Sequence, residues 1–329
     1  MSATKGPTRS LDCSIVIATY DRPAALAETL RSCQAQTNAL GLTGEIVVLD
    51  NHPSQNGKAV AEAATGALPW PIRHVAELTR NMSTLRNRGF SEARGALVAF
   101  IDDDEVAALD WLDQLVGALR GAQADIAVGP RLARFAAGAP PAYDPTGAQF
   151  VRDLHLPDGA LVALTAATGK PRYGLGTGNS LFDLARCFGD GEPAMREAFG
   201  DAGGEDAELF VRLHRKGRRI VWAAKAFVTE TVPAHRTAVP YRLTRTLREA
   251  QHYVSIYRDG ARRPGLTALE LWAKGIAQIV VGGVWAAATL EFLSNRRLSA
   301  RILIANGLGK VSFAKPIGYI NEPASLTKY

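Results

Sequence analysis

A run of four consecutive acidic residues, Asp102 to Glu105, directly follows an apolar segment at residues 96–101. A short, continuous apolar segment is typical of a strand that is buried on both faces of a parallel sheet. The acids then lie where the strand ends, and ligand sites of open α/β sheets lie at the carboxyl ends of their strands. Adjacent carboxylates repel one another unless a cation or hydrogen-bond donors neutralise them, and Mg²⁺ binds carboxylates together with substrate phosphates. The run therefore indicates a cation and phosphate site, with a solvated acidic turn as the alternative.

The first part of the chain alternates between strand-like and helix-like segments. This alternation predicts right-handed βαβ units and hence an α/β fold, with a mostly parallel sheet flanked by helices. The predicted strands are residues 13–19, 45–49, 71–75, 96–101 and 126–129, and the predicted helices are residues 23–36, 57–65, 83–93 and 111–119. Residues 135–172 contain several Pro and Gly and are predicted to form a long functional loop. Ordered structure is predicted again at residues 174–184, with a helix at 205–215 and a final strand or hairpin at 220–229.

The length and net charge of the chain limit the number of domains and the kinds of partner that it can have. A chain of 329 residues holds one large domain, or one domain with an appendage. The net charge is +6, and residues 212–263 carry thirteen Lys or Arg against three acids. This excess predicts a phosphate-bearing partner or an anionic membrane surface, and no nucleic acid, because the usual nucleic-acid-binding motifs are absent. Three scattered cysteines and a short polar N-terminus predict a reduced, cytosolic environment and no signal peptide.

Polar side chains also follow the other predicted strands. Tyr20, Asp21 and Arg22 follow the first strand, and Asp50 ends the second. Arg86 lies in the helix that precedes the acidic strand. Asp50 can accept a hydrogen bond from a pyrimidine imide or a ribose hydroxyl, and Arg86 can bind a diphosphate through its fork of donors. Because strand ends meet at one edge of a parallel sheet, these groups predict a site for an activated nucleotide.

Four motifs at these positions resemble those of the family 2 glycosyltransferases, which have the GT-A fold. They are residues 14–23 (SIVIATYDRP), 47–51 (VVLDN), 86–89 (RNRG) and 100–104 (FIDDD). The resemblance implies a GT-A domain at residues 12–236 that moves a sugar from a nucleotide-sugar donor to an acceptor hydroxyl. A disordered N-terminus at residues 1–11 and a basic and apolar helical extension at residues 237–329 are predicted on either side.

The resemblance also assigns a donor site. The residues that it places around the donor nucleotide are Thr19, Tyr20, Arg22, Asp50, Arg86 and Asp102. Asp102 and Asp104 match the two acids of the family's DxD motif, so that Asp102 would face the ribose and Asp104 would hold Mg²⁺ or Mn²⁺ against the diphosphate. Asp103 lies between them, and its role is left open. The predicted nucleobase is uracil, with guanine and thymine as alternatives, because one Asp and one Tyr do not specify it.

A catalytic carboxylate is implied in an acidic pair that opens a later helix. Residues 203–209 (GGEDAEL) match that pattern. Sugar transfer requires a base that takes the proton of the acceptor hydroxyl as the oxygen attacks the anomeric carbon. We predict Asp206 as this base, with Glu205 as the second candidate. A single base opposite the leaving group predicts inversion of the anomeric carbon, whereas the alternative is that both acids only stabilise the helix N-terminus.

Three further residues are candidates on weaker signals. Asn179 ends a glycine-rich segment where the family has an Asn near the donor sugar or the acceptor, and a tight turn is the alternative. Residues 230–236 (ETVPAHR) resemble a segment of bacterial members that build exopolysaccharides. A late His completes the metal shell in GT-A enzymes, so His235 is a candidate ligand, with a surface or packing role as the alternative. Arg236 is predicted to meet the donor diphosphate or a lipid phosphate.

The C-terminal part is apolar at residues 269–293, and arginines flank this segment. An interfacial or re-entrant membrane helix, a membrane span and a core or oligomer helix all remain open. Polysaccharide-building members of the family often use acceptors carried on a polyprenyl diphosphate. We therefore predict a peripheral or re-entrant enzyme at the cytoplasmic face of the inner membrane, with a glycan or polyprenyl-diphosphate-linked acceptor.

Two other functions remain as alternatives. A sugar nucleotidylyltransferase shares the α/β domain and the metal carboxylate, but it needs a glycine-rich loop after the first strand, where this chain has residues 18–22 (ATYDR). A non-catalytic scaffold that binds a nucleotide or a glycan at a membrane polysaccharide assembly would not need the acidic pair at Glu205 and Asp206.

Overall fold

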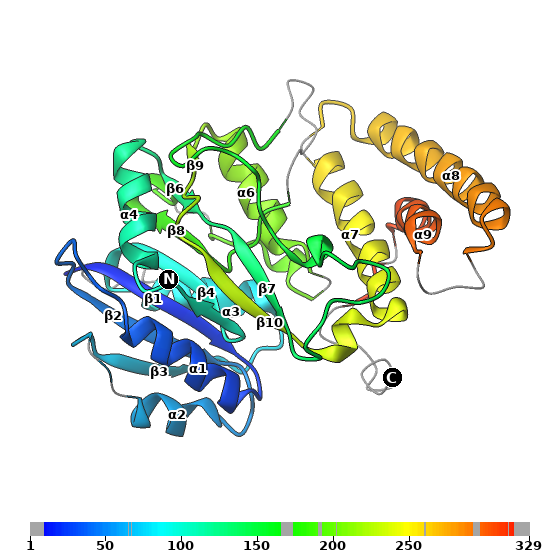
Figure 1. Ribbon diagram of the computed structural model, residues 1–329. Coiled ribbons are helices and arrows are strands. Elements are labelled where there is room, and N and C mark those ends of the chain that lie inside the picture. The colour runs from blue at the N-terminus through cyan, green and yellow to red at the C-terminus, as the bar shows by residue number, and fades with distance from the viewer. Residues whose placement is uncertain are drawn as a thin grey trace.

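The computed structural model describes residues 10–64, 66, 68–165, 174–189, 193–201, 203–259, 261–291, 297–314 and 316–318. Its centre is a seven-stranded sheet in the order β3-β2-β1-β4-β8-β6-β9 (Figure 1). The strands are β1 (Leu11–Thr19), β2 (Gly44–Asp50), β3 (Ile72–Ala76), β4 (Gly95–Asp102), β6 (Ile126–Val128), β8 (Ser180–Asp183) and β9 (Ile220–Trp222). β8 pairs antiparallel with β4 and β6, and the other pairs are parallel. The predicted α/β fold with a mostly parallel sheet is confirmed.

The register of the central strands aligns their carboxyl ends. Thr19 of β1 lies opposite Asp50 of β2, and Ala18 lies opposite Asp102 of β4. The motifs that end these three strands therefore lie at one edge of the sheet. The residues that make up β1 and β2 are almost all buried, as expected for strands with helices on both faces.

Two hydrophobic clusters cover the two faces of the sheet. One contains apolar side chains of α1 (Pro23–Gln34), α2 (Gly57–Ala63) and α4 (Trp111–Gly121). The other contains side chains of α3 (Met82–Glu92), α5 (Leu184–Cys187) and α6 (Glu205–Arg215). The helices predicted at residues 23–36, 57–65, 83–93, 111–119 and 205–215 are thus present, and α5 is a short additional helix (Figure 1).

A second sheet of three short strands is present that the sequence pattern does not reveal. It has the order β5-β10-β7, with β5 (Glu105–Ala107), β7 (Arg131–Phe135) and β10 (Val228–Val232). The prediction of one strand or hairpin at residues 220–229 is wrong, because β9 and β10 belong to different sheets. The chain crosses between them where the carbonyl oxygen of Ala226 accepts a hydrogen bond from the side chain of Asn179.

The predicted loop at residues 135–172 contains one short 3₁₀ helix, η1 (Ala148–Phe150), and isolated bridges to Arg131 and Val221 in its described part. Residues 166–172 of that prediction lie outside the described residues, as do residues 1–9 of the predicted disordered N-terminus. Two further 3₁₀ helices are present: η2 (Glu197–Phe199) precedes α6, and η3 (Ala234–Thr237) follows β10.

Three helices form the C-terminal extension: α7 (Val239–Asp259), α8 (Pro264–Ala288) and α9 (Ser299–Val311). The apolar helix predicted at residues 269–293 begins earlier, at Pro264, and ends at Ala288; residues 292 and 293 lie outside the described residues. α8 packs on α9 through small residues, since a side chain at Gly275 would meet the backbone oxygen of Gly307 at 2.8 Å. By length and composition α8 is a weak candidate for a membrane span, and 22% of its most apolar window is buried.

Candidate active site

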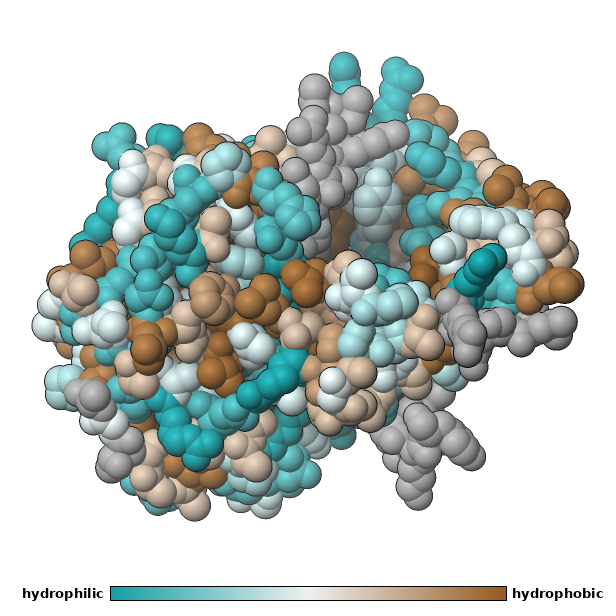
Figure 2. All heavy atoms as spheres, viewed as in Figure 1, coloured by the Kyte–Doolittle hydropathy of each residue, from teal (hydrophilic) through white to brown (hydrophobic). Residues whose placement is uncertain are grey.

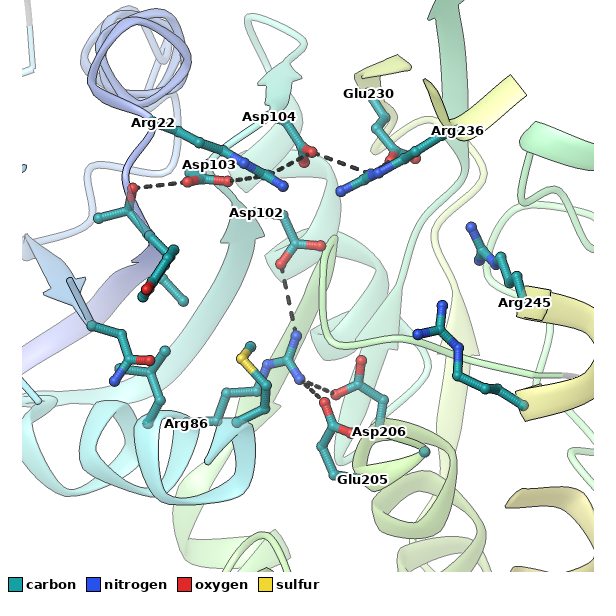
Figure 3. A pocket seen from close by; sticks show the side chains of 18 of the residues that line it. Arg22, Arg86, Asp102, Asp103, Asp104, Glu205, Asp206, Glu230, Arg236 and Arg245 are labelled. Carbon is teal, nitrogen blue, oxygen red and sulfur yellow. Dashed lines mark hydrogen bonds and ion pairs between the residues drawn. The ribbon is translucent and has the colours of Figure 1, made fainter. Parts of the chain in front are cut away.

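A cavity of about 730 Å³ opens at the carboxyl ends of β1 and β4 and extends to the N-terminus of α6 and one face of α7 (Figure 3). It brings together residues from segments that are far apart in the sequence. The predicted site residues that line it are Thr19, Tyr20, Arg22, Arg86, Asp102, Asp104, Glu205, Asp206, His235 and Arg236.

Asp103 and Asp104 are neutralised by arginines from two elements. Arg22 Nη1 lies 3.0 Å from Asp103 Oδ1 and 2.9 Å from Asp104 Oδ2. Asp103 also accepts a hydrogen bond from the hydroxyl of Thr19 at 2.8 Å. Arg236 Nη1 lies 3.4 Å from Asp104 Oδ2. Asp103 is therefore a buried anchor for the loop after β1, an assignment that the sequence leaves open.

Burial and neighbouring acids dominate the electrostatics of Asp104. The pKa of its carboxyl is raised to about 6, chiefly by desolvation and also by the nearby acids Asp102 and Glu230, while Arg236 and Arg22 oppose the shift. A bound cation would remove this electrostatic cost, because it stabilises the ionised carboxylate. The Asp104 carboxylate is thus suited to binding a cation in addition to the two arginines.

Asp102 ends β4 with its side chain 39% exposed toward the cavity. Its backbone N–H donates to Glu105 Oε2 at 3.0 Å, which holds the end of the strand. A Cβ atom at Gly178 would lie 2.5 Å from Asp102 Oδ2. Only glycine at position 178 therefore leaves the Asp102 carboxylate in place.

Arg86 of α3 connects the strand-end acids with the acidic pair of α6 (Figure 3). Its guanidinium bonds to Glu205 Oε1, and its Nη1 lies 3.0 Å from Asp206 Oδ1. Its Nη2 lies 3.9 Å from Asp102 Oδ1. Asp206 also accepts a hydrogen bond from the hydroxyl of Thr177 at 3.0 Å. The buried guanidinium of Arg86 thus orients three carboxylates, one at the end of β4 and two at the start of α6.

The two acids of α6 differ in their surroundings. The pKa of Glu205 is raised to about 7, chiefly by burial and then by the neighbouring Asp206 carboxylate, against the effect of Arg86. Gly204, in the left-handed conformation with φ of +86°, turns the chain into the helix so that both acids occupy its first turn. Both acids line the cavity, but the Glu205 side chain is only 9% exposed, whereas that of Asp206 is 21% exposed. Asp206 is therefore the more accessible of the two acids from the cavity.

The opposite end of the cavity has an aromatic surface. Tyr20 is 42% exposed and contacts the ring of His52 edge-on at a centroid distance of 5.0 Å. The guanidinium of Arg80 lies 5.7 Å from the Tyr20 ring centroid. Asn51 and Met82 complete this wall. An aromatic ring with an arginine beside it is a surface on which a nucleobase can stack.

Asp50 lies beneath this end and does not contribute to the described cavity wall. It is fully buried, and its carboxylate accepts hydrogen bonds from the backbone N–H groups of His52 and Gly57 at 3.0 and 2.8 Å. His74 Nε2 lies 3.4 Å from Asp50 Oδ2. In this structure Asp50 fixes the start of α2 through backbone donors, in a position set back from the predicted nucleobase contact.

Asn179 is also buried and set back from the described cavity wall. Its Oδ1 accepts a hydrogen bond from the indole N–H of Trp111, and its Nδ2 donates to the carbonyl oxygens of Pro130 and Ala226, each at 2.7 Å. Its φ of +58° lies in the left-handed region that Asn tolerates better than most residues. These contacts show that Asn179 anchors the surrounding backbone, and its contact with sugar or acceptor stays a prediction.

His235 lies in the cavity wall with its ring 5.9 Å from that of Tyr241. Within the described part of the chain, no group of three His, Cys, Asp or Glu side chains is arranged to hold a metal ion by itself. His235 therefore does not form a ligand set with Asp102 and Asp104 in this conformation. Two carboxylates at a cavity are nevertheless a suitable partial ligand set for Mg²⁺ or Mn²⁺, because such ions take further oxygens from substrate phosphates and water.

One wall of the cavity is not predicted from the sequence. It is formed by Tyr241, Arg245, Arg248 and His252 of α7. Their spacing of four, three and four residues places them on one face of the helix. That spacing is visible in the sequence, but it does not indicate which face of α7 meets the active site.

Comparisons with known proteins agree with this arrangement. The family profile described as "Glycosyl transferase family 2" matches residues 14–160. The chain is 31% identical over 297 residues to succinoglycan biosynthesis protein ExoM of Rhizobium meliloti (strain 1021), covering 88% of each chain. It is 29% identical over 220 residues to validoxylamine A glucosyltransferase of Streptomyces hygroscopicus subsp. jinggangensis, covering 62% of this chain and 51% of that protein.

Two solved structures share the fold at low sequence identity. Mannosyltransferase PcManGT from Pyrobaculum calidifontis, in complex with GDP-Man and Mn²⁺, has a TM-score of 0.56 at 17% identity and covers 95% of this chain and 89% of its own. S. aureus TarS 1-349, in complex with UDP, has a TM-score of 0.52 at 16% identity and covers 94% of this chain and 93% of its own. With the motifs, the fold and the ExoM similarity, the chain belongs to glycosyltransferase family 2 and is a glycosyltransferase with the GT-A fold.

Proposed function

We propose that this glycosyltransferase moves a sugar, with inversion, from a nucleoside-diphosphate donor to a hydroxyl group of a glycan acceptor in polysaccharide assembly. The observation that carries the proposal is the bridge made by Arg86. It lies 3.9 Å from Asp102 and 3.0 Å from Asp206, so the group proposed to face the donor and the proposed base occupy one cavity. The ExoM similarity over 88% of both chains supports a polysaccharide acceptor.

The proposed reaction uses the residues of the cavity in separate roles. Asp206 takes the proton of the acceptor hydroxyl. As it does so, the hydroxyl oxygen attacks the anomeric carbon, and the bond from that carbon to the diphosphate breaks. Arg86, Arg22 and Arg236 stabilise the charge that develops on the diphosphate. Asp102 and Asp104 would hold Mg²⁺ or Mn²⁺, which would supply further positive charge to the leaving group. The bound Mn²⁺ of PcManGT supports the use of a divalent ion.

For the donor we propose a UDP-sugar, with the nucleobase against Tyr20. The UDP complex of TarS supports uridine, and the GDP-Man complex of PcManGT makes guanosine the alternative. Thermal unfolding of the purified protein with UDP, GDP, dTDP and CMP, each with and without Mn²⁺, tests this proposal. A ligand bound only by the folded state raises the midpoint, so one nucleotide should do so in a metal-dependent manner. No shift with any nucleotide would favour the non-catalytic scaffold, and synthesis of a nucleotide-sugar from a sugar phosphate would favour the nucleotidylyltransferase.

Two substitutions separate the roles of the acids. Asp104→Ala should remove the metal-dependent part of nucleotide binding, and an unchanged affinity would exclude Asp104 from the metal site. Asp206→Asn should lower transfer by about a hundredfold or more while nucleotide affinity stays close to that of the unmodified enzyme. Full activity of Asp206→Asn would show that the base lies elsewhere. Asp158→Asn is the matched control, because that acid pairs with Lys225 at the surface.

We further propose that the enzyme binds peripherally at the cytoplasmic face of the inner membrane through α8. The outer side of this helix is apolar (Figure 2), with Leu269, Val280 and Val284 each about 60% or more exposed. Arg262 and Arg263 precede the helix and would meet anionic headgroups. The exposed apolar side chains support burial in the interfacial region of a bilayer.

Flotation with vesicles that contain anionic phospholipid tests membrane binding. The unmodified protein should float with the vesicles, and Val280→Asp with Val284→Asp should abolish flotation. Leu109→Asp is the matched control, because Leu109 is a similarly exposed apolar residue outside α8. Equal flotation of all three proteins, or of none, would reject α8 as the membrane-binding element.

A further inference from the structure

The α7 side of the cavity carries two arginines, Arg245 and Arg248, that have no role in the transfer reaction proposed above. Tyr241, Arg245, Arg248 and His252 share one face of α7 and line the cavity. Figure 3 shows Arg245 on the far side of the strand-end acids from Arg22. The inference that follows rests on the proposed transfer reaction and concerns what these arginines bind.

α7 is fixed directly against the start of α6. A Cβ atom at Gly204 would lie 2.7 Å from Cγ of His252, so the helix contacts the residue that immediately precedes the acidic pair. Arg248 lies four residues before His252 on α7, a rise of about 6 Å along the helix axis. Arg248 thus lies about one turn of α7 from the contact with α6, Arg245 lies about one turn further, and both line the cavity that contains Asp206, the proposed base.

The arginines nearer to β1 and β4 have other assignments. Arg22 pairs with Asp103 and Asp104, and Arg86 pairs with Glu205 and Asp206. Arg245 and Arg248 lie on α7, where Glu249 is the acid that lines the cavity with them. Arg245 Nε donates a hydrogen bond to Glu249 Oε1 at 2.8 Å, and the Arg245 side chain is 40% exposed. Arg248 is 4% exposed yet lines the cavity, which places a guanidinium in a sheltered site suited to an anion.

We propose that Arg245 and Arg248 bind a phosphate group of the acceptor. The acceptor hydroxyl must reach Asp206, so the rest of the acceptor occupies the part of the cavity next to α6, which α7 lines. Guanidinium groups pair with phosphate oxygens through two parallel N–H donors. From this wall the chain continues through α7 to the exposed apolar side of α8, which suits an acceptor whose phosphate is attached to a lipid.

Calorimetry on the full-length protein, saturated with UDP and Mn²⁺ (or with GDP if that is the nucleotide bound), tests the proposal. Geranyl phosphate serves as a soluble lipid phosphate, and inorganic phosphate distinguishes a free anion from a lipid-attached one. Geranyl phosphate should bind the unmodified protein, and Arg245→Gln or Arg248→Gln should weaken it by about tenfold or more, as expected for a lost charge-assisted bond. Nucleotide affinity should change by less than about twofold.

Two control variants separate charge, geometry and folding. Arg242→Gln removes one positive charge from the same helix, but Arg242 donates to Gln149 Oε1 at 3.0 Å and is absent from the cavity wall among the described residues. It should leave geranyl phosphate binding unchanged. Arg245→Lys keeps the charge and loses the planar fork, so its loss should be smaller than that of Arg245→Gln. Nucleotide binding by each variant reports that the cavity is folded.

Each outcome has a distinct meaning. Equal loss of nucleotide and geranyl phosphate would assign the arginines to the donor site and overturn the inference. No binding of geranyl phosphate by a nucleotide-bound protein, or inorganic phosphate binding equally well, would also overturn it while the donor proposal stands. Arginine-dependent binding of geranyl phosphate to a protein that binds no nucleotide would support the phosphate site and overturn the proposed transfer reaction.

Discussion

Replacing Asn179 by Ala should destabilise the protein strongly while leaving nucleotide binding by the folded protein nearly unchanged. The substitution removes three buried hydrogen bonds of 2.7 Å and leaves the Trp111 indole and the carbonyl groups of Pro130 and Ala226 without these partners. Each buried polar group left unsatisfied costs about 1–3 kcal/mol. Ala in the left-handed conformation adds about 1 kcal/mol. With partial relaxation we expect a loss of about 3–6 kcal/mol in the free energy of unfolding.

Urea unfolding followed by circular dichroism measures this change, and calorimetric titration with UDP and Mn²⁺ measures nucleotide affinity below the transition. Asn38→Ala is the matched control, because Asn38 also has a positive φ, of 47°, and binds the backbone N–H and oxygen of Leu42 through its side chain. Asn38 is only half-buried, so water can replace its bonds and the loss should be about 1 kcal/mol.

A stability loss below about 1 kcal/mol for Asn179→Ala would contradict the structural role of these three hydrogen bonds, since that value is no larger than the loss expected for one partly exposed hydrogen bond. Loss of sugar transfer at unchanged stability would mean that Asn179 contacts the donor sugar or the acceptor, as the sequence resemblance implies. If Asn179→Ala does not accumulate as a folded protein, Asn179→Gly removes the backbone strain and keeps the test of the three hydrogen bonds.

Two further substitutions test the electrostatics and the packing of the site. The raised pKa of Glu205, about 7 against an ordinary value of 4.5, means that its contribution to stability is fully present below pH 4.5 and is lost as the pH rises through 7. In Glu205→Gln, the free energy of unfolding should therefore fall by about 3 kcal/mol less between pH 4.5 and 8 than in the unmodified protein. Urea unfolding across that pH range measures this difference, and the same pH dependence in both proteins would contradict the raised pKa of Glu205. Gly178→Ala should rotate the Asp102 carboxylate away from its place and weaken metal-dependent nucleotide binding by about tenfold or more with little change in melting temperature, whereas unchanged binding would show that the loop yields instead.

The local sequence pattern was sufficient to predict most strands of the main sheet. The continuous apolar segments of β1, β2 and β4 and the helix between each pair predict their own structure, because burial on both faces requires apolar side chains throughout. The strands of the small sheet could not be predicted in this way. β5 has three residues and pairs with β10, more than a hundred residues later, so its structure depends on a partner that local periodicity does not reveal.

The same distinction applies to the active site. The acids after β4 and those that open α6 are visible as short motifs, and the structure brings both to one cavity. Asp50 shows the limit of such inference, because its carboxylate is directed to backbone donors at the start of α2. A strand-end position predicts the edge of the sheet at which a residue lies, but the direction of its side chain depends on the packing around it.

By itself, the sequence determined the alternation of strands and helices in the first part of the main sheet, the edge of the sheet that carries the polar residues, and the positions of the acids proposed for catalysis. These properties follow from hydrophobic periodicity and residue chemistry, which act over a few neighbouring positions. The tertiary structure decided that Arg86 joins Asp102 to Asp206, that Asn179 anchors the backbone at Pro130 and that α7 lines the cavity with arginines. Arg86 and Glu205 are separated by 119 positions, and only the packing of α3 and α6 against the same face of the sheet brings such residues into contact.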